Sequence, residues 1–222
     1  MARRRTHAPL RVFLNNRLVG QLSKASTGAI GFQYDPQWLE WEHALPVSLS
    51  LPLREDVYRG EVVAAVFENL LPDSDVLKRR VAESVGAAGT DAYSLLAAIG
   101  RDCIGAMQFM AVDMADEEDT TTIKGEPITE AAIETLLRGL SQSPLGLSRE
   151  EAFRISVAGA QEKTALLRHK SRWWKPAGTT PTTHIFKKQI GRLPNGLDLS
   201  DSVENEFYCL KLAEAFGLPV AK

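Results

Sequence analysis

A short loop of small residues, at positions 158–160, carries the strongest chemical signal in the chain. A β-prone run at residues 153–157 leads into the loop, and a second one at residues 164–168 leaves it. Small residues let backbone N–H groups approach a ligand closely, and successive N–H groups can surround an anion. A lysine at the far lip adds positive charge, and Ser156 just before the loop could accept a phosphate. The pattern predicts a phosphate-binding hairpin, whose candidate residues are Ala158, Gly159, Ala160, Gln161, Glu162 and Lys163.

This loop differs from the common phosphate-loop motifs, because Gly159 is its only glycine and no G-K-[ST] ending follows. A hairpin with small residues can also be a plain connection between two strands. In that interpretation Ser156 is an ordinary strand residue, and Glu162 and Lys163 are a surface charge pair. The residues of this stretch leave both interpretations open.

Two further charged residues follow the loop in an order that suits nucleotide binding. Residues 182–187 are predicted to form a strand that ends in Lys187. Residues 198–216 are predicted to form a helix, and Glu206 falls on its apolar stripe. A carboxylate on an apolar stripe needs a partner, and an ion pair with Lys187 would also hold that lysine for phosphate binding. The competing interpretation leaves Lys187 solvated at a strand end and Glu206 at a helix edge in water.

The remaining pattern predicts the scaffold that must position these residues. Alternation of apolar and polar residues indicates strands, and apolar residues every three or four positions indicate helices. Strands are predicted at residues 10–14, 18–22, 30–34, 46–51 and 104–112, with a strand or turn at Trp173 and Trp174. Helices are predicted at residues 62–71, 91–99 and 129–140, and from Asp73 through residue 81. Capping is expected from Asp73 and Thr129, and from a capping box of Asp201 and Glu204. The acidic, threonine-rich residues 115–126 are predicted to be a loop or linker.

Composition sets limits on the class of protein. The 222 residues carry 26 basic and 28 acidic side chains, a net charge of −2, which gives no global attraction to nucleic acid. Arginines 3–5 make the N-terminus locally basic, which is typical of a solvated tail. Cys103 and Cys209 are far apart, and no signal peptide is recognised, so we expect reduced thiols in a cytoplasmic protein. The 4 histidines form no ligand cluster, which argues against a metal enzyme, and no apolar run is long enough to span a bilayer.

Several long strings together resemble the HipA family, the serine/threonine kinase toxins of bacterial toxin–antitoxin pairs. The strings are RISVAGAQEKTALL from Arg154, TPTTHIFK from Thr180 and LDLSDSVENEFYCLKLA from Leu197, with LSLPL, FENLLPDS and AIGRDCIGA in the N-terminal half. The resemblance runs from about Leu10 to the end of the chain. It implies an α+β fold, with a HipA N-terminal subdomain at residues 1–125. A linker helix and a kinase-like N-lobe would follow at residues 126–222.

The resemblance also implies a role for each matching position. Residues 158–163 would form the phosphate loop over ATP, with Lys163 facing the phosphates. Lys187 would be the ATP lysine and Glu206 the best candidate for its partner on the following helix. Ser156 matches the serine that the family autophosphorylates, and a charge of about −2 there would repel nucleotide phosphates. The implied partners are a HipB-like helix-turn-helix antitoxin, which would provide the only link to DNA, and a protein substrate, typically an aminoacyl-tRNA synthetase.

One departure concerns the catalytic groups. The family's C-lobe carries the adenine-reading hinge, the catalytic aspartate and the Mg²⁺ ligands, and these motifs do not occur before Lys222. The Arg101–Asp102 pair lies upstream of the phosphate loop, so it cannot be the catalytic loop in this topology. We therefore expect no catalytic residue within these positions, and no kinase activity from this chain alone, because phosphoryl transfer needs the base, the metal and the lysine together.

The resulting prediction is the N-terminal portion of a HipA-type serine/threonine kinase toxin, which with ATP and Mg²⁺ would phosphorylate a protein serine and arrest growth. Two alternatives remain open. The chain could be a non-catalytic fragment that binds the antitoxin or regulates the kinase, or it could be one half of a split kinase.

Overall fold

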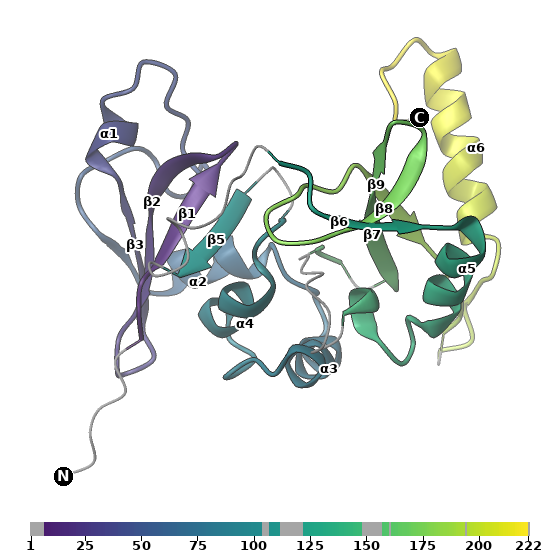
Figure 1. Ribbon diagram of the computed structural model, residues 1–222, viewed down its shortest axis with the longest axis horizontal. Coiled ribbons are helices and arrows are strands. Elements are labelled where there is room, and N and C mark those ends of the chain that lie inside the picture. Colours follow the sequence, from purple (N-terminus) through teal and green to yellow (C-terminus); the bar gives the residue numbers. More distant parts are fainter. Residues whose placement is uncertain are drawn as a thin grey trace.

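The computed structural model describes residues 7–103, 107–111, 122–147, 157–159, 161–193 and 195–221. Figure 1 shows two antiparallel β-sheets side by side, the first in purple to teal and the second mostly in green. Each sheet has its own helices, and the path of the chain runs through the first sheet before it enters the second. The chain is therefore a mixed α and β structure built from two sheet units in sequence order.

The first sheet has five strands in the order β4-β3-β2-β1-β5, and all of its strand pairs are antiparallel. Its strands are β1 (Leu10–Leu14), β2 (Arg17–Lys24), β3 (Ile30–Tyr34), β4 (Tyr58–Arg59) and β5 (Met107–Ala111). The turn between β1 and β2 consists of Asn15 and Asn16, with φ of 49° and 62°. Asparagine tolerates this left-handed region, and two such residues in a row match the twist of a tight hairpin, which confirms the predicted hairpin.

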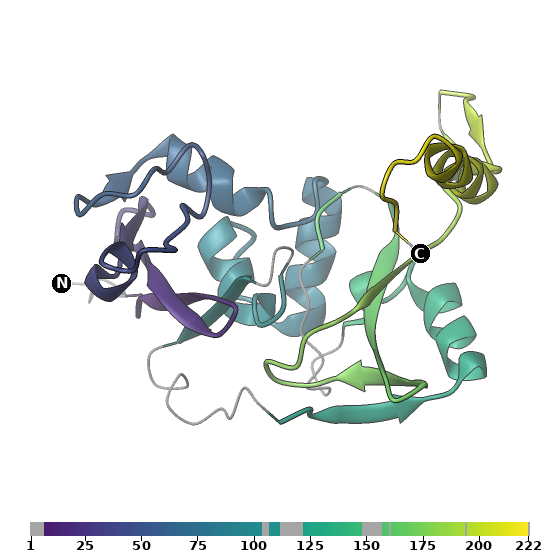
Figure 2. The ribbon, with the colours of Figure 1, turned by 90° about the horizontal axis from the view of Figure 1, so that it is seen from above.

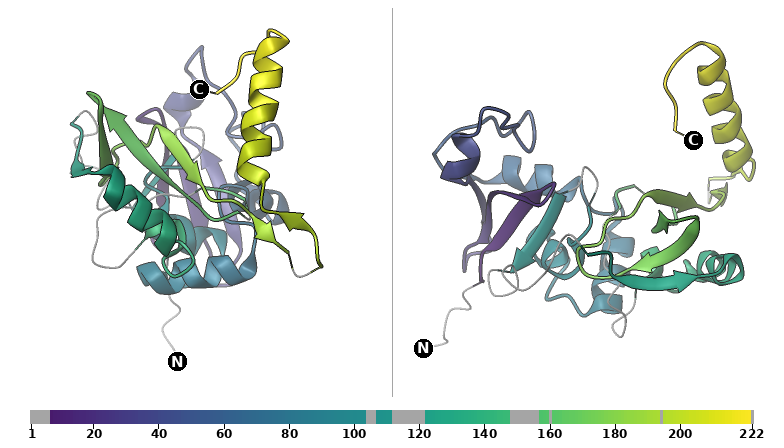
Figure 3. Two further views of the ribbon diagram at one scale, coloured as in Figure 1. Left: turned by 90° about the vertical axis from the view of Figure 1, so that its right-hand side faces the viewer. Right: turned by 45° about the horizontal axis from the view of Figure 1, so that its top comes forward.

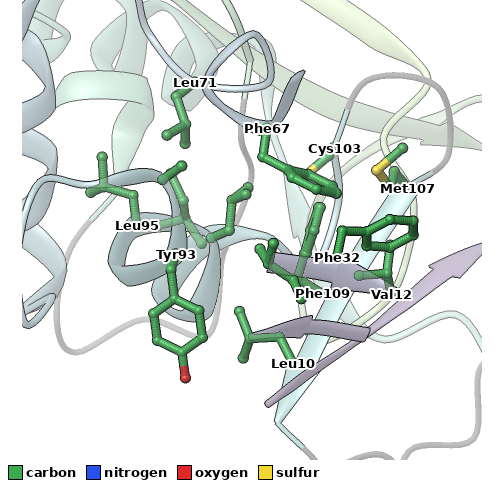
Figure 4. Packing of buried hydrophobic residues seen from close by; sticks show 14 of the residues in the cluster. Leu10, Val12, Phe32, Phe67, Leu71, Tyr93, Leu95, Cys103, Met107 and Phe109 are labelled. Carbon is green, nitrogen blue, oxygen red and sulfur yellow. The ribbon is translucent and has the colours of Figure 1, made fainter. Parts of the chain in front are cut away.

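The helices α2 (Glu61–Glu68) and α4 (Ala92–Ile99) pack on this sheet, and α3 (Asp75–Val85) packs against α4. Phe67 of α2 packs against Phe32 of β3 and Phe109 of β5, with ring centroids 5.4 and 5.6 Å apart (Figure 4). The predicted helices are confirmed, with one correction to a cap. Ser74, and not Asp73, is the N-cap of α3, because its side chain accepts from Leu77 N while its backbone is extended.

The predicted strand at residues 46–51 is wrong, since this segment forms bends and turns in the structure. Tyr34, at the end of β3, explains the difference. Its hydroxyl donates to Leu51 O and accepts from Val47 N at 3.0 Å, so the segment wraps around one side chain. Leu49, an apolar residue of the alternating pattern, is 94% exposed at the resulting turn. A short helix, α1 (Pro36–Leu39), precedes this segment.

The second sheet has four strands in the order β6-β8-β7-β9. They are β6 (Gly125–Ile128), β7 (Lys163–His169), β8 (Arg172–Pro176) and β9 (His184–Lys187). Trp173 and Trp174 both lie in β8. The predicted linker at residues 115–126 needs a correction at its end, because Gly125 and Glu126 belong to β6 and pair with β8. Residues 115–121 of that stretch, and residues 153–156 of the strand predicted before the phosphate loop, lie outside the described residues.

Helices accompany the second sheet at two places in the chain: one lies between β6 and β7, and another follows β9. The helix α5 (Glu130–Gly139) is capped by Thr129, as predicted, and a 3-10 turn at η2 (Pro144–Gly146) follows it. The predicted helix at residues 198–216 is α6 (Ser202–Ala215), and it begins later than expected. Asp198 and Leu199 instead form β11, which pairs with β10 (Gly191–Arg192) in a two-stranded hairpin.

The two units share one hydrophobic core. Leu145, Leu147, Val157 and Ala165 from the second unit belong to the same buried cluster as the first sheet and its helices. In Figure 2, α3 and α4 lie between the two sheets, where such a shared core requires them. Within the part of the chain that the structure describes, no helix is long and apolar enough to cross a membrane.

The last helix is packed less closely than the others. Figure 3 shows α6, in yellow, standing beside the second sheet at the outer end of the molecule. None of its residues is buried, and Phe207 and Tyr208 are 62% and 66% exposed. Of the residues that formed the predicted apolar stripe, Val203 is 44% exposed, and Leu210 and Ala213 are only partly buried.

Candidate functional site

The structure brings two of the predicted lysines together at one edge of the second sheet. Lys163, the first residue of β7, is the direct cross-strand partner of Lys187, the last residue of β9. Direct partners on neighbouring strands point to the same face of a sheet. Both side chains therefore lie on one face, at the end of β7 where the small-residue loop arrives.

Lys187 forms the ion pair with Glu206 that the order of the residues suggested. Its Nζ lies 2.7 Å from Glu206 Oε1, and the two side chains are 37% and 49% exposed. A pair this exposed contributes at most about 1 kcal/mol to stability. Its effect is geometric, because it holds the lysine amine on the side of the sheet that faces α6. The role of this pair in nucleotide binding stays a prediction.

Lys163 has a different environment. Its side chain is only 8% exposed, and its Nζ donates a hydrogen bond to Ala158 O at 2.6 Å. Burial and the positive charge of Lys187 lower the pKa of Lys163, and the negative charge of Asp73 has a smaller effect in the opposite direction. In this structure the amine therefore closes the small-residue loop upon itself, and its contact with phosphate remains a prediction.

Gly159 has a structural reason to be glycine. Its φ is +104°, a region that residues with a side chain rarely adopt, and a Cβ here would lie inside contact distance of Lys163 Nζ. The amine thus occupies the space where a side chain would start. Gly159 and Lys163 form one unit of the loop, and neither can change without affecting the other.

A second set of contacts fastens the end of the loop to the end of β9. Lys188 Nζ lies 3.0 Å from Glu162 Oε2, and Lys188 N donates to Glu162 O at 3.3 Å. Gln161 Nε2 donates to Lys188 O. Glu162 is therefore not merely a free surface charge, since it joins the loop to the strand that carries Lys187. The residue order alone did not indicate this contact.

A hollow of about 470 Å³ opens beside the ion pair. It lies between the loop, the β10–β11 hairpin and the start of α6, and its lining includes Gln161, Asn205 and Glu206. Small-molecule sites typically measure about 300–1,000 Å³. The expected capping box at this helix is wrong, because the side chain of Asp201, the N-cap, makes no capping hydrogen bond. The start of α6 consequently presents its polar residues to the hollow.

The remaining predicted site residues are Ser156 and Ala160, and both lie outside the described residues. In the described ranges, no group of three or more His, Cys, Asp or Glu side chains could hold a metal ion. The sequence did not predict that Asp102 contacts the segment before β9. Asp102 accepts two hydrogen bonds from Thr182, which precedes β9, and the only sequence signal was its place in the Arg-Asp pair.

Comparison with known families finds a match for each half of the chain. Residues 10–110 match the HipA N-terminal domain, and residues 155–222 match the HipA-like C-terminal domain. The second match starts just before the small-residue loop and includes both Lys187 and Glu206. The two matches follow each other in the same order as the two sheet units.

Individual relatives agree with these family matches. Y4mE of Sinorhizobium fredii, a kinase by its name, is 34% identical over 221 residues, which are 96% of this chain and 49% of Y4mE. The serine/threonine-protein kinase toxin HipA of Shewanella oneidensis is 26% identical over 214 residues, covering 96% of this chain and 45% of that toxin. The chain spans about half the length of both.

A solved structure extends the comparison to the fold. The complex of Shewanella oneidensis HipA, HipB and their operator DNA matches with a TM-score of 0.67 and 26% identity, covering 96% of this chain and 46% of the matched one. The family matches and the fold thus define one class of protein, which joins a HipA N-terminal domain to a HipA-like C-terminal domain. The chain belongs to the HipA family.

Proposed function

We propose that this chain forms the phosphate-binding half of a HipA-type serine/threonine protein kinase, with residues 126–222 corresponding to the N-lobe of a protein kinase. The observation that carries the proposal is the ion pair between Lys187 and Glu206, 2.7 Å long, beside a loop of small residues. A protein kinase uses a strand lysine held by a helix glutamate to position the ATP phosphates. The chain order of loop, lysine strand and helix is the same here.

In this proposal each residue has a defined task. The backbone around Ala158 and Gly159 surrounds the phosphates, and Lys187, held by Glu206, contacts the α- and β-phosphates. Bound ATP would supply the γ-phosphoryl group, and Mg²⁺ would neutralise its charge. The catalytic aspartate and the Mg²⁺ ligands are proposed to come from a helical C-lobe outside these 222 residues. Transfer to a protein serine, with an aminoacyl-tRNA synthetase as substrate and growth arrest as outcome, is proposed from the resemblance to the family.

Two further roles are proposed on the same basis. Ser156 is proposed as the autophosphorylation site, where a charge of about −2 would oppose the binding of nucleotide phosphates next to it. A HipB-like helix-turn-helix antitoxin is proposed as the partner, with contact to DNA only through that antitoxin. The solved relative supports this, because it is a complex of HipA with HipB and operator DNA.

Binding of a fluorescent ATP analogue with Mg²⁺ to the 222-residue chain tests the proposal. Lys187→Met removes charge-assisted hydrogen bonds worth about 1.5–3 kcal/mol, so we expect affinity to fall roughly ten- to hundredfold. Glu206→Gln should weaken binding less, because the lysine keeps its charge and loses only its position.

A second lysine–glutamate pair on the same helix provides a matched control. Lys211 and Glu214 lie 2.9 Å apart on α6, with side chains 60% and 47% exposed, and neither lines the hollow beside the loop. Lys211→Met and Glu214→Gln should bind the analogue like the unmodified chain. Equal affinity of Lys187→Met and Lys211→Met would contradict the proposed role of Lys187.

A further inference from the structure

The segment that leads into β9, residues 179–183, is rich in threonine, and hydrogen bonds attach its threonines to other parts of the protein. Thr179 and Thr180 are 6% and 5% exposed, which is unusual for hydroxyl residues. Gln108 Nε2, from β5 of the first sheet, donates to Thr179 O at 3.1 Å. Lys124 N donates to Thr180 Oγ1 at 2.8 Å. The backbone and side chains of these threonines therefore anchor the segment to elements distant in sequence.

Asp102 supplies the anchor nearest to the lysine strand. Its Oδ2 accepts from Thr182 N at 2.8 Å and from Thr182 Oγ1 at 2.6 Å, across a separation of 80 residues. Asp102 lies between α4 and β5, so the contact joins the first sheet unit to the second. Burial of its carboxyl raises the pKa of Asp102, and the two bonds from Thr182 lower it without fully offsetting burial. Because burial disfavours the charged form of this carboxyl, the two hydrogen bonds from Thr182 are what stabilise it.

The position of β9 explains why such an anchor matters. Among the described strands, β9 lies at the edge of its sheet, since β7 is its one neighbour in the order β6-β8-β7-β9. A slip of one residue along β7 would turn Lys187 to the opposite face of the sheet, away from Glu206. Thr183 N, which donates to Leu166 O at 3.0 Å, is the first link between this segment and β7. Fixing Thr182 just before that link sets the register of the whole strand.

We propose that Asp102 is a positioning residue for the candidate nucleotide site, because its paired bonds to Thr182 set the register of β9 and thereby the place of Lys187. The N-terminal unit then has a share in the site without contacting the nucleotide. This inference rests on the proposed nucleotide function only for its binding assay, and its structural part can be measured without any ligand.

Three variants of the full chain test it. Asp102→Ala removes the acceptor, and Asp102→Asn keeps an oxygen acceptor while it removes the charge. Asp91→Ala is the matched control, because Asp91 also accepts hydrogen bonds in the first unit, from Ser94 and Lys24, but does not touch the threonine segment. The readouts are amide hydrogen exchange of residues 184–187 without nucleotide, and the affinity for the fluorescent ATP analogue.

We expect faster exchange at residues 184–187 and an affinity about tenfold lower in Asp102→Ala, since one anchoring pair of bonds is lost. Asp102→Asn should restore both readouts most of the way. Asp91→Ala should lower stability yet leave both unchanged. Equal exchange and equal affinity in Asp102→Ala and Asp91→Ala would overturn the role of Asp102.

The two proposals fail in different ways. If the unmodified chain binds no nucleotide, the proposed function fails, and the exchange of residues 184–187 still decides whether Asp102 positions the strand. If Asp102→Ala does not fold, Thr182→Ala replaces it, because this change removes only the hydroxyl donor and leaves the bond from Thr182 N. Unchanged exchange in Thr182→Ala would then contradict the proposal.

Discussion

Replacing Gly159 by alanine tests whether Lys163 closes the loop in solution. Two separate costs are expected from the structure. The φ of +104° is strained for alanine, which costs about 1–3 kcal/mol. The new Cβ would also displace Lys163 Nζ from Ala158 O, and a hydrogen bond from a charged group is worth about 1.5–3 kcal/mol. Because Lys163 is buried, solvent does not replace that bond cheaply.

A double-mutant cycle separates the two costs. Lys163→Ala removes the bond and the obstructing amine, so Gly159→Ala made in that background should cost only the backbone strain. The free energy of unfolding, measured by urea denaturation, should therefore show a coupling of about 1.5 kcal/mol or more between the two positions. Lys163→Met is a second background, because it removes Nζ but keeps most of the apolar stem; since Lys163 Cε lies 3.9 Å from the new Cβ, Gly159→Ala should cost only the backbone strain there as well.

The refuting result is simple additivity. If the two substitutions add within about 0.3–0.5 kcal/mol, the usual limit for independent sites, the amine does not occupy the space beside Gly159. In that case Lys163 would be free to point at a ligand, as the family resemblance implied. The same cycle repeated on the affinity for the ATP analogue would show which of the two states the nucleotide selects.

Other changes test the scaffold, each by urea denaturation. Burial tends to raise the pKa of Asp91, but its hydrogen bonds lower this pKa below 3.8, so the carboxylate stabilises the fold above that pH and the stabilisation is lost as the pH falls. Asp91→Asn should therefore lower the free energy of unfolding at pH 7. A difference between the variant and the unmodified chain that does not shrink towards pH 3 would contradict this. Thr164→Val should cost about 1–3 kcal/mol, because Leu145 O would lose its buried donor at 2.7 Å, whereas Thr164→Ser should cost less. Gly20→Ala should cost about 1–3 kcal/mol, because a Cβ would fall inside contact distance of Gln33 O on the paired strand, and a neutral result would place the two strands further apart.

Local patterns predicted much of this fold. The paired asparagines between β1 and β2 and the cap at Thr129 are signals read over a few neighbouring residues, and the structure contains both of them. The pairing of Lys187 with Glu206 followed from the order of strand and helix and from the need of a carboxylate for a partner. Its reason was partly wrong, because α6 fully buries none of the residues of the apolar stripe that suggested it.

What the sequence could not predict depends on contacts between distant residues. The turn at residues 46–51 follows from the hydroxyl of Tyr34, and no local pattern contains that side chain. The contact of Asp102 with Thr182 crosses 80 residues and joins the two units. The start of α6 shifted to Ser202 because Asp198 and Leu199 found strand partners in β10. In each case a long-range partner overrode the local preference.

The loose packing of α6 has a consequence for the lysine at the site. An isolated helix of 14 residues is marginally stable in water, and α6 buries none of its residues. Besides its chain connections, its bonds to the rest of the protein include Lys187 to Glu206 and Ile190 N to Ser202 Oγ. The helix is therefore expected to open locally at little cost, and each opening releases Lys187. The fraction of molecules with a paired lysine becomes an equilibrium, and any molecule that packs on the exposed face of α6 would shift that equilibrium towards the paired state.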